Sequence, residues 1–329
     1  MTDATKTLIA GVDIGGTKLA VGVSNAHGEI LSERRQPSDA KRGADAVVTD
    51  IIAMVESAVC EAGRPEDLTF LGVASPGPLS QKRGVILETP NMPGWYNYPL
   101  VERLQGRFGC ATVLENDANA ACLGEALFGA GRGQRFVAYF TISTGIGGGF
   151  VQDGKVLRGQ DGNAAEFGHQ IIVPFNGATC GCGKRGHLEA YGNGRSIVRR
   201  ALEALEAGER STILDYVPDG EELTTRYLAQ AANHGDALAK RIWEETGFYI
   251  GIGVVNVVQS FNPGVVVLGG GITKVGDLLF EPVRRTVGDL VMDDYKGSFT
   301  IEQAVLEDRV GVMGAIGLAL EPGILKMPS

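Results

Sequence analysis

One local pattern occurs twice in this chain, and the repeat restricts the folds that it can adopt. Residues 7–35, "TLIAGVDIGGTKLAVGVSNAHGEILSERR", predict an apolar strand, a Gly-Gly turn, a second strand, another turn and a third strand. Residues 137–159, "VAYFTISTGIGGGFVQDGKVLRG", repeat this order. Two similar lobes follow, because each sheet needs its own covering helices. Two unrelated hairpins are the alternative.

The segments around the repeats predict an α/β protein. "AVVTDIIAMVESAVCEAG" has helical apolar spacing and ends in glycine, while "TFLGVASPGPL" is a buried strand that leads into a Pro-Gly loop. "SFNPGVVVLGGGIT" is a further buried strand that ends in glycines. The last helix, "VGVMGAIGLAL", is apolar nearly all round, so we expect other elements to cover it.

Charge and cysteine usage exclude several classes of protein. The net charge of −9 disfavours binding to nucleic acid through phosphates. No apolar run approaches a membrane-spanning helix, and the first residues lack the pattern of a secretory signal. Cys60, Cys110 and Cys122 are scattered and are typical of small core residues. We therefore expect a cytoplasmic protein without a disulfide framework.

The two glycine turns are candidate phosphate sites. "DIGGTK" (Asp13 to Lys18) is not a P-loop, and "TGIGGG" is not a dinucleotide fingerprint, because each opens a strand and not a helix. Glycine turns nevertheless let backbone N–H groups converge on an anion, and two of them could grip a polyphosphate. Asp13 could hold Mg²⁺, directly or through water. Ordinary hairpin turns explain the same pattern.

Asn116 and Asp117, in "LENDANAACLGEALFG", lie where a strand gives way to a helix. Asp117 has two interpretations. It is either the N-cap of the helix or a general base toward a hydroxyl group. The spacing alone does not choose between them.

Over nearly its whole length the chain resembles the ROK sugar kinases of the hexokinase–actin superfamily. The resemblance lies in eight segments that follow the order of the family: "DIGGTK", "SPGP", "TPNMPGW", "LENDANAA", "STGIGGG", "EFGH", "CGCGKRGHLE" and "NPGVVVLGGG". It implies a two-lobed α/β fold of the ribonuclease H-like, actin/hexokinase type, with an active-site cleft between the lobes. Residues 1–116 and about 308–329 would form the small lobe. Residues 117–307 would form the large lobe, with the zinc loop and the second ATP turn.

The resemblance also implies roles for individual residues. Asp117 would deprotonate the 6-hydroxyl of a sugar, which then attacks the γ-phosphate of ATP. The other sugar-binding residues would be Asn91, Asn116, Glu166, His169 and Glu189. ATP with Mg²⁺ would be held by Asp13, Gly15, Gly16, Thr17, Lys18, Thr144 and Gly145, with Gly269, Gly270 and Gly271 beside the nucleoside.

A structural zinc ion is implied as well, but this chain departs from the family pattern at one ligand. The family uses the "E-x-G-H" histidine and three cysteines, and here His187 stands in place of the third cysteine. Imidazole suits tetrahedral Zn²⁺ as well as thiolate does. We therefore expect His169, Cys180, Cys182 and His187 to bind Zn²⁺. An empty remnant and a chance cluster are the alternatives.

ATP-dependent phosphorylation of glucose to glucose 6-phosphate is the expected activity, since the chain is most similar to the glucokinase branch. Fructose, mannose, allose and N-acetylated hexosamines are the alternative sugars, and the sequence does not exclude another phosphoryl donor. A sugar-sensing repressor is expected to carry a DNA-binding domain, and only 12 residues precede Asp13. An actin-like ATPase has no use for a hydroxyl-binding "E-x-G-H". We expect a homodimer or homotetramer.

Overall fold

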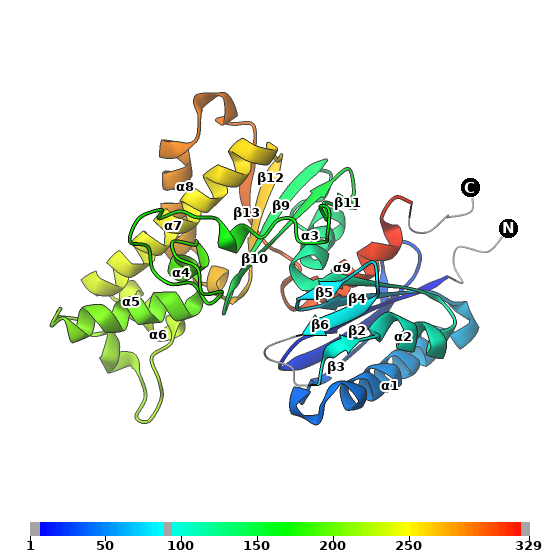
Figure 1. The fold of residues 1–329 in the computed structure, drawn as a ribbon. Helices are drawn as coiled ribbons and strands as arrows, with labels where there is room; N and C mark the ends of the chain where they lie inside the picture. The colour runs from blue at the N-terminus through cyan, green and yellow to red at the C-terminus, as the bar shows by residue number, and fades with distance from the viewer. Residues whose placement is uncertain (1–6, 89–93, 324–329) are drawn as a thin grey trace. The chain divides into compact units, whose positions relative to one another are not determined.

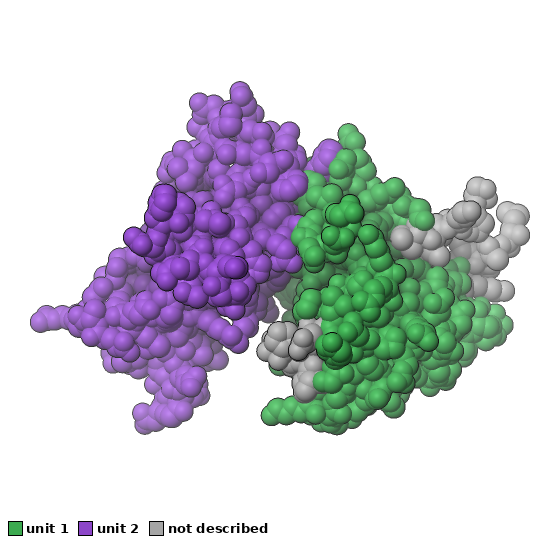
Figure 2. All heavy atoms as spheres, in the orientation of Figure 1, with its two compact units in different colours: residues 1–135, 149–164, 305–329 green, residues 136–148, 165–304 purple. Residues whose placement is uncertain are grey.

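The computed structural model describes residues 7–88 and 94–323, and the chain divides into two compact units (Figures 1 and 2). Unit 1 comprises the described residues of 1–135, 149–164 and 305–329. Unit 2 comprises residues 136–148 and 165–304. Both contain helices and strands, so the α/β class predicted from the sequence is confirmed.

Unit 1 is built on a five-stranded sheet and a small three-stranded sheet. Its strands are β1 (Leu8–Ile14), β2 (Lys18–Ser24), β3 (Ile30–Pro37), β4 (Leu68–Ser75), β5 (Leu79–Ser80), β6 (Val85–Glu88), β7 (Tyr96–Tyr98) and β8 (Ala111–Asn116). The short strand β11 (Lys155–Val156) also falls within the residues of unit 1, but it belongs to the second five-stranded sheet. Its helices are α1 (Ala44–Ala62), α2 (Leu100–Phe108), α3 (Asp117–Phe128) and α9 (Val310–Leu320).

The large sheet of unit 1 has the order β3-β2-β1-β4-β8. β1, β2 and β3 are antiparallel neighbours, whereas β4 pairs in parallel with β1 and with β8. In this register Asp13 is opposite Ala74, and Ser75 is opposite Asn116. The carboxyl ends of parallel strands share one edge of a sheet. The topology therefore brings Asp13 and the Asn116–Asp117 junction to the same edge.

Helix α9 packs against β1, β4 and α3. Residues 311–319 of this helix are all buried, as its apolar sequence predicts. Its backbone lies very close to both neighbours: a Cβ on Gly314 would lie 1.9 Å from the carbonyl oxygen of Ala120, and a Cβ on Gly72 would lie 1.9 Å from that of Ala315. Only glycine permits such contacts without a shift of the backbone.

Unit 2 holds most of the second sheet and most of the remaining helices. Its strands are β9 (Phe136–Ile142), β10 (Ile146–Gln152), β12 (Val265–Gly269) and β13 (Thr300–Gln303). Its helices are α4 (Glu189–Gly192), α5 (Gly194–Glu206), α6 (Thr225–Asn233), α7 (Ala237–Phe261) and α8 (Asp277–Leu290), with the short 3₁₀ helices η4 (Phe167–His169) and η6 (Gly271–Val275).

The second sheet repeats the topology of the first, with the order β11-β10-β9-β12-β13. β10 and β11 are antiparallel, while β12 pairs in parallel with β9 and β13. The two glycine turns thus occupy equivalent places, after β1 and after β9. The predicted repeat is confirmed, and the alternative of two unrelated hairpins is wrong.

The compact units do not divide at residue 117, where the sequence-based lobes were expected to meet. Residues 117–135 and 149–164 belong to unit 1, and the division falls within β10. The close backbone contact between α3 and α9 accounts for this grouping of α3. In residues 7–88 and 94–323, no helix combines the length and the apolar character that crossing a membrane requires.

Candidate active site

The first glycine turn connects β1 to β2. The Gly15 N–H donates to the Lys18 carbonyl at 2.9 Å, which closes the turn and leaves Gly16 and Thr17 exposed. Ser38 holds the turn from the end of β3: its hydroxyl donates to the Gly16 carbonyl at 2.7 Å and its N–H to the Thr17 carbonyl at 3.0 Å. An exposed backbone of this kind is suited to an anion, and the phosphate-binding role of this turn stays a prediction.

Asn116, and not Asp117, caps α3. The Asn116 Oδ1 accepts hydrogen bonds from the N–H groups of Ala118 at 3.0 Å and Asn119 at 3.3 Å. Asp117 is the first residue of the helix, and its Oδ1 accepts from the Ala118 N–H at 2.8 Å. Because Asn116 supplies the cap, the N-cap interpretation of Asp117 is wrong.

Two carboxyl groups at this edge of unit 1 have raised pKa values. Burial raises the pKa of Asp117 above its ordinary value of 3.8. Burial also raises the pKa of Asp13 to about 6, and the negative charge of Asp117 adds to this increase. Two neighbouring acidic groups without full compensation favour the approach of a cation. A raised pKa also makes a carboxylate a better proton acceptor near neutral pH.

The second glycine turn, in unit 2, borders a cavity of about 880 Å³. The Ser143 N–H donates to the Gly145 carbonyl at 2.9 Å within the turn, and the Gly194 N–H donates to the Ser143 carbonyl at 2.8 Å from the start of α5. The cavity is lined by Ser143, Thr144, Gly194, Arg195, Thr225, Gly271 and Ile272, among others. Its size suits a nucleotide.

Gly269, Gly270 and Gly271 lie at the end of β12 and the start of η6. Gly270 has φ of 91°, and a Cβ there would lie 2.4 Å from the carbonyl oxygen of Ile142, so a larger residue is excluded. Gly271 lines the same cavity as Thr144. The structure thus brings together these two predicted nucleotide-binding segments.

His169 and Glu166 lie at η4. The Nε2 of His169 is 4.0 Å from the Oε2 of Glu166, and its Nδ1 is 3.7 Å from the Sγ of Cys180. The two ring nitrogens therefore face different partners. One faces the Cys/His cluster and the other faces a carboxylate that is available to a polar ligand.

His169, Cys180, Cys182 and His187 form one cluster, in which the four ligand atoms lie within 4.8 Å of one another. The Sγ of Cys182 is 3.3 Å from the Nδ1 of His187. Burial and the nearby His169 lower the pKa of His187, which keeps its imidazole neutral, the form that binds metals. Burial raises the pKa of the Cys180 thiol to about 12, so a bound cation is needed to hold it as thiolate at neutral pH.

The cluster is held by backbone bonds between segments that are distant in sequence. Ile171 and His187 form an antiparallel bridge, and the Leu188 N–H donates to the Gln170 carbonyl at 2.9 Å. Cys180 donates its N–H to the Lys184 carbonyl at 2.8 Å and closes the hairpin that contains Cys182. The chain after His169 therefore returns to the cluster, so that residues 180–187 can bind the same ion as His169.

Glu189 connects this cluster to the second glycine turn. Its Oε1 accepts from the Cys180 thiol at 3.4 Å, and its Oε2 accepts from the Ile146 N–H at 2.9 Å. The carboxylate is thus fixed at the start of α4. Of the predicted site residues, only Asn91 lies outside the described part of the chain.

Two groups of residues were not predicted from the sequence. Gly194, Arg195 and Thr225 line the nucleotide-sized cavity. The signal for the first two was Asn193, a helix N-cap whose Oδ1 accepts from the Ser196 N–H at 2.8 Å. The buried Glu115, two residues before Asp117 in sequence, pairs with the half-buried Arg158, and the sequence pattern gives no signal for this ion pair.

A family model described as "ROK family" matches residues 9–321. The chain belongs to the ROK family. A glucokinase of Thermotoga maritima is 35% identical over 316 residues, which cover 96% of this chain and 98% of the relative.

Solved ROK structures share the fold. A ROK hexokinase from Thermus thermophilus has a TM-score of 0.82 at 36% identity, covering 96% of this chain and 99% of the other. A ROK family glucokinase from Streptomyces griseus, solved in complex with glucose and AMPPNP, has a TM-score of 0.75 at 36% identity, covering 94% and 98%. The resemblance and the actin/hexokinase-type α/β fold predicted from the sequence are confirmed.

The raised pKa of Asp13 predicts a pH-dependent stability of this ROK protein. The folded chain binds the Asp13 proton more tightly than the unfolded chain does. The protonation of Asp13 therefore adds to the free energy of unfolding below about pH 4, and this stabilisation is lost as the pH rises through about 6. Asp13→Asn removes the charge that burial penalises. In buffer without Mg²⁺ or nucleotide, we expect it to raise the free energy of unfolding at pH 8 by up to about 3 kcal/mol. Near pH 4 the variant should match the wild type.

Urea unfolding at both pH values measures the effect. Asp153→Asn is the control with the opposite sign, because a hydrogen bond from Arg135 lowers the pKa of Asp153. If Asp13→Asn changed the free energy of unfolding by the same amount at pH 8 and at pH 4, the raised pKa of Asp13 would be contradicted.

Proposed function

We propose that this protein transfers the γ-phosphoryl group of ATP to the 6-hydroxyl of a hexose, with glucose as the preferred sugar and Asp117 as the general base. The observation that most directly supports the proposal is the position of Asp117. It is a carboxylate with a raised pKa at a strand–helix junction, and Asn116 leaves it free of the capping role. The similarity to glucokinases of Thermotoga maritima and Streptomyces griseus gives independent support.

The chemistry requires one proton transfer and one phosphoryl transfer. The Asp117 carboxylate accepts the proton of the sugar 6-hydroxyl while O6 forms a bond to the γ-phosphorus. The bond from that phosphorus to the bridging oxygen breaks, and ADP leaves with the electron pair. Since the protein forms no covalent bond, its contribution is positioning and the compensation of charge.

The two glycine turns are proposed to bind the phosphates. The Gly15–Lys18 turn of unit 1 offers exposed backbone N–H groups and the Lys18 side chain. The Thr144–Gly145 turn and Gly269–Gly271 of unit 2 line or adjoin the cavity that would take the nucleotide. Asp13 is the proposed ligand of Mg²⁺, directly or through water, because its carboxylate lies in an acidic environment that a cation relieves. Bound Mg²⁺ supplies compensation for the phosphate charge.

Asn91, Asn116, Glu166, His169 and Glu189 are the proposed ligands of the other sugar hydroxyls. Carboxylates accept hydrogen bonds from hydroxyl groups, and amide and imidazole N–H groups donate them. The positions of Glu166 and of His169 Nε2 support this role, since both present polar atoms to the same point of unit 2. Assembly as a homodimer or homotetramer and a cytoplasmic location remain predictions from the sequence.

Asp117→Asn tests the general base. The substitution keeps the size and hydrogen-bonding ability of the side chain but removes the proton acceptor, so turnover should fall by about 10² or more while sugar binding persists. Because burial penalises the Asp117 charge, the melting temperature should not fall. Steady-state kinetics, sugar binding by calorimetry and thermal melting measure these three quantities. Asp161→Asn, an exposed position of the same unit, is the control, and near-normal turnover in Asp117→Asn would refute the assignment.

Glucose preference is tested by kcat/KM across hexoses in an ADP-release assay. We expect glucose to give the highest value with ATP and Mg²⁺, and phosphorylation to occur at O6, which NMR of the product identifies. A tenfold or greater preference for fructose or N-acetylmannosamine would overturn the sugar assignment and leave the kinase assignment standing. A panel of phosphoryl donors in the same assay tests ATP.

We also propose that the Cys/His cluster binds a structural Zn²⁺. Two thiolates and two imidazoles supply the four N and S donors that zinc prefers, and all four atoms lie within 4.8 Å of one another. Two thiolates balance the charge of the ion. Since the protein fills all four positions, the ion would order the loop and would not bind substrate. Glu189 and Glu166 are the sugar-binding residues that this order would fix.

Metal content tests His187 as the fourth ligand. We expect about one zinc per chain in the wild type and in His187→Cys, less zinc in His187→Ala, and a raised sugar KM in His187→Ala. His234→Ala is the matched control, because His234 is an exposed histidine of unit 2 that bonds to the Gln230 carbonyl. Elemental analysis of the purified proteins gives the result. Unchanged zinc content and kinetics in His187→Ala would reject the site.

A further inference from the structure

Glu115 is a completely buried carboxylate that directly precedes Asn116 and Asp117. Its Oε1 accepts from the Asn116 N–H at 2.8 Å, from the Asn119 side-chain amide at 3.1 Å, and from the side-chain amide of Gln81. One oxygen atom therefore holds the end of β8, the first turn of α3 and the turn after β5. These are the segments around the proposed general base.

The second oxygen of Glu115 belongs to an ion pair. Arg158 donates from Nε to the Oε2 of Glu115 at 2.7 Å. The other end of the same guanidinium group forms a bidentate pair with Glu321, from Nη1 at 2.7 Å and Nη2 at 2.6 Å. Glu321 is buried and also accepts from the Val156 N–H at 3.0 Å. The chain Glu115–Arg158–Glu321 thus connects the β8–α3 junction to β11 and to the segment after α9.

Stability alone is a weak reason for this arrangement. Burial raises the pKa of Glu115 although Arg158 opposes the increase, so the charges are costly to bury. Buried ion pairs of this kind are often no more stabilising than apolar residues of similar volume, while their directional bonds fix geometry. Phosphoryl transfer depends strongly on geometry, because a displacement of about 1 Å can reduce the rate by about a hundredfold.

We propose that Glu115, Arg158 and Glu321 form a positioning network that fixes the orientation of Asp117 toward the sugar hydroxyl. The inference rests on the proposed role of Asp117 as general base. None of the three residues is the proton acceptor. Glu115 holds the backbone N–H of Asn116. The next N–H of the first turn of α3, that of Ala118, donates to the side chains of Asn116 and Asp117, so the position of this turn fixes both side chains.

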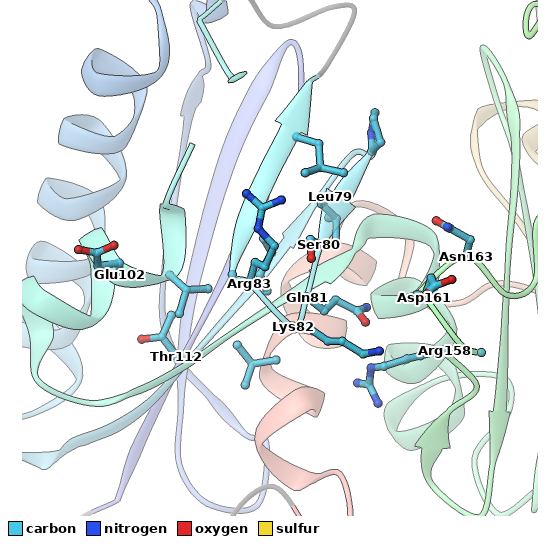
Figure 3. Close-up of a pocket in the computed structure, with 18 of the residues that line it drawn as sticks. Leu79, Ser80, Gln81, Lys82, Arg83, Glu102, Thr112, Arg158, Asp161 and Asn163 are labelled. Carbon is cyan, nitrogen blue, oxygen red and sulfur yellow. The ribbon is translucent and has the colours of Figure 1, made fainter. Parts of the chain in front are cut away.

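A cavity beside the network makes a chemical test possible. Arg158 and Gln81 line a cavity of about 1260 Å³ within unit 1, which Arg83 and Lys82 also border (Figure 3). A small planar cation that enters this cavity can reach the position of the Arg158 side chain. Removal of the side chain leaves space for such a cation between Glu115 and Glu321.

Arg158→Gly and guanidinium ion are the test. We expect kcat with glucose to fall by about ten- to a hundredfold, with the ATP KM within about twofold of the wild type. Millimolar guanidinium chloride should restore a large part of kcat in this variant, whereas the same concentration of sodium chloride should not. Arg83→Gly is the matched control, since Arg83 borders the same cavity but bonds to Asn97. It should keep the kcat of the wild type and show no response to guanidinium.

Glu321→Gln keeps the test decisive if Arg158→Gly does not fold. This variant retains the shape of the side chain but weakens the bidentate pair with Arg158. At a temperature below the melting point of the variant, we expect kcat to be about tenfold lower than in the wild type, again with little change in the ATP KM. A wild-type kcat in a folded Arg158→Gly or Glu321→Gln variant would overturn the inference. A loss of kcat in Arg158→Gly that guanidinium does not restore would also overturn it. If the wild type phosphorylates no hexose, the proposed function fails. If the wild type is active and the variants keep its kcat, only the positioning network fails.

Discussion

Close backbone contact along α9 is the constraint on which unit 1 depends. Gly314 allows α9 to touch α3, and Gly72 allows the sheet to touch α9, each at a distance that leaves no space for a Cβ. The helix is therefore fixed on two sides by atoms that cannot change rotamer. Its contacts determine where α3 begins relative to the edge of the sheet. Because Asp117 is the first residue of α3, the position of the proposed base follows from the packing of residues that are distant from it in sequence.

Apolar packing cannot fix the polar segments at the ends of the strands, and the two units solve this problem differently. In unit 1 the buried Glu115 carboxylate collects donors from several segments around the β8–α3 junction. In unit 2 four N and S atoms from distant parts of one loop region converge within 4.8 Å. In each arrangement, directional bonds take the place of hydrophobic contacts. Such bonds fix the positions of the groups that they join, while their net contribution to stability is small.

The sequence predicted those features that depend on local pattern. The repeated strand–turn–strand segments gave both sheets, because alternating burial and glycine punctuation are local signals. The cluster of His169, Cys180, Cys182 and His187 was expected from the resemblance to the ROK family, with His187 in place of the third cysteine of the family. The unit boundary was not predicted, since the grouping of α3 with unit 1 results from contact with α9, almost 200 residues later. Arg158 and Glu321 are also far apart in the sequence, where each is typical of a surface charge, so their pairing was not predicted.

The cap of α3 shows how one side chain can free another for chemistry. Asn and Asp are both good N-caps, so "ND" at a helix start leaves the choice open. The structure assigns the capping bonds to Asn116, whose oxygen takes two N–H groups. An aspartate that served as the cap would have its charge stabilised by those N–H groups, and its pKa would fall. Asp117 accepts only the Ala118 N–H of these two, which lowers its pKa, but burial outweighs that bond. The pKa of Asp117 therefore rises, which is the direction that general-base catalysis requires.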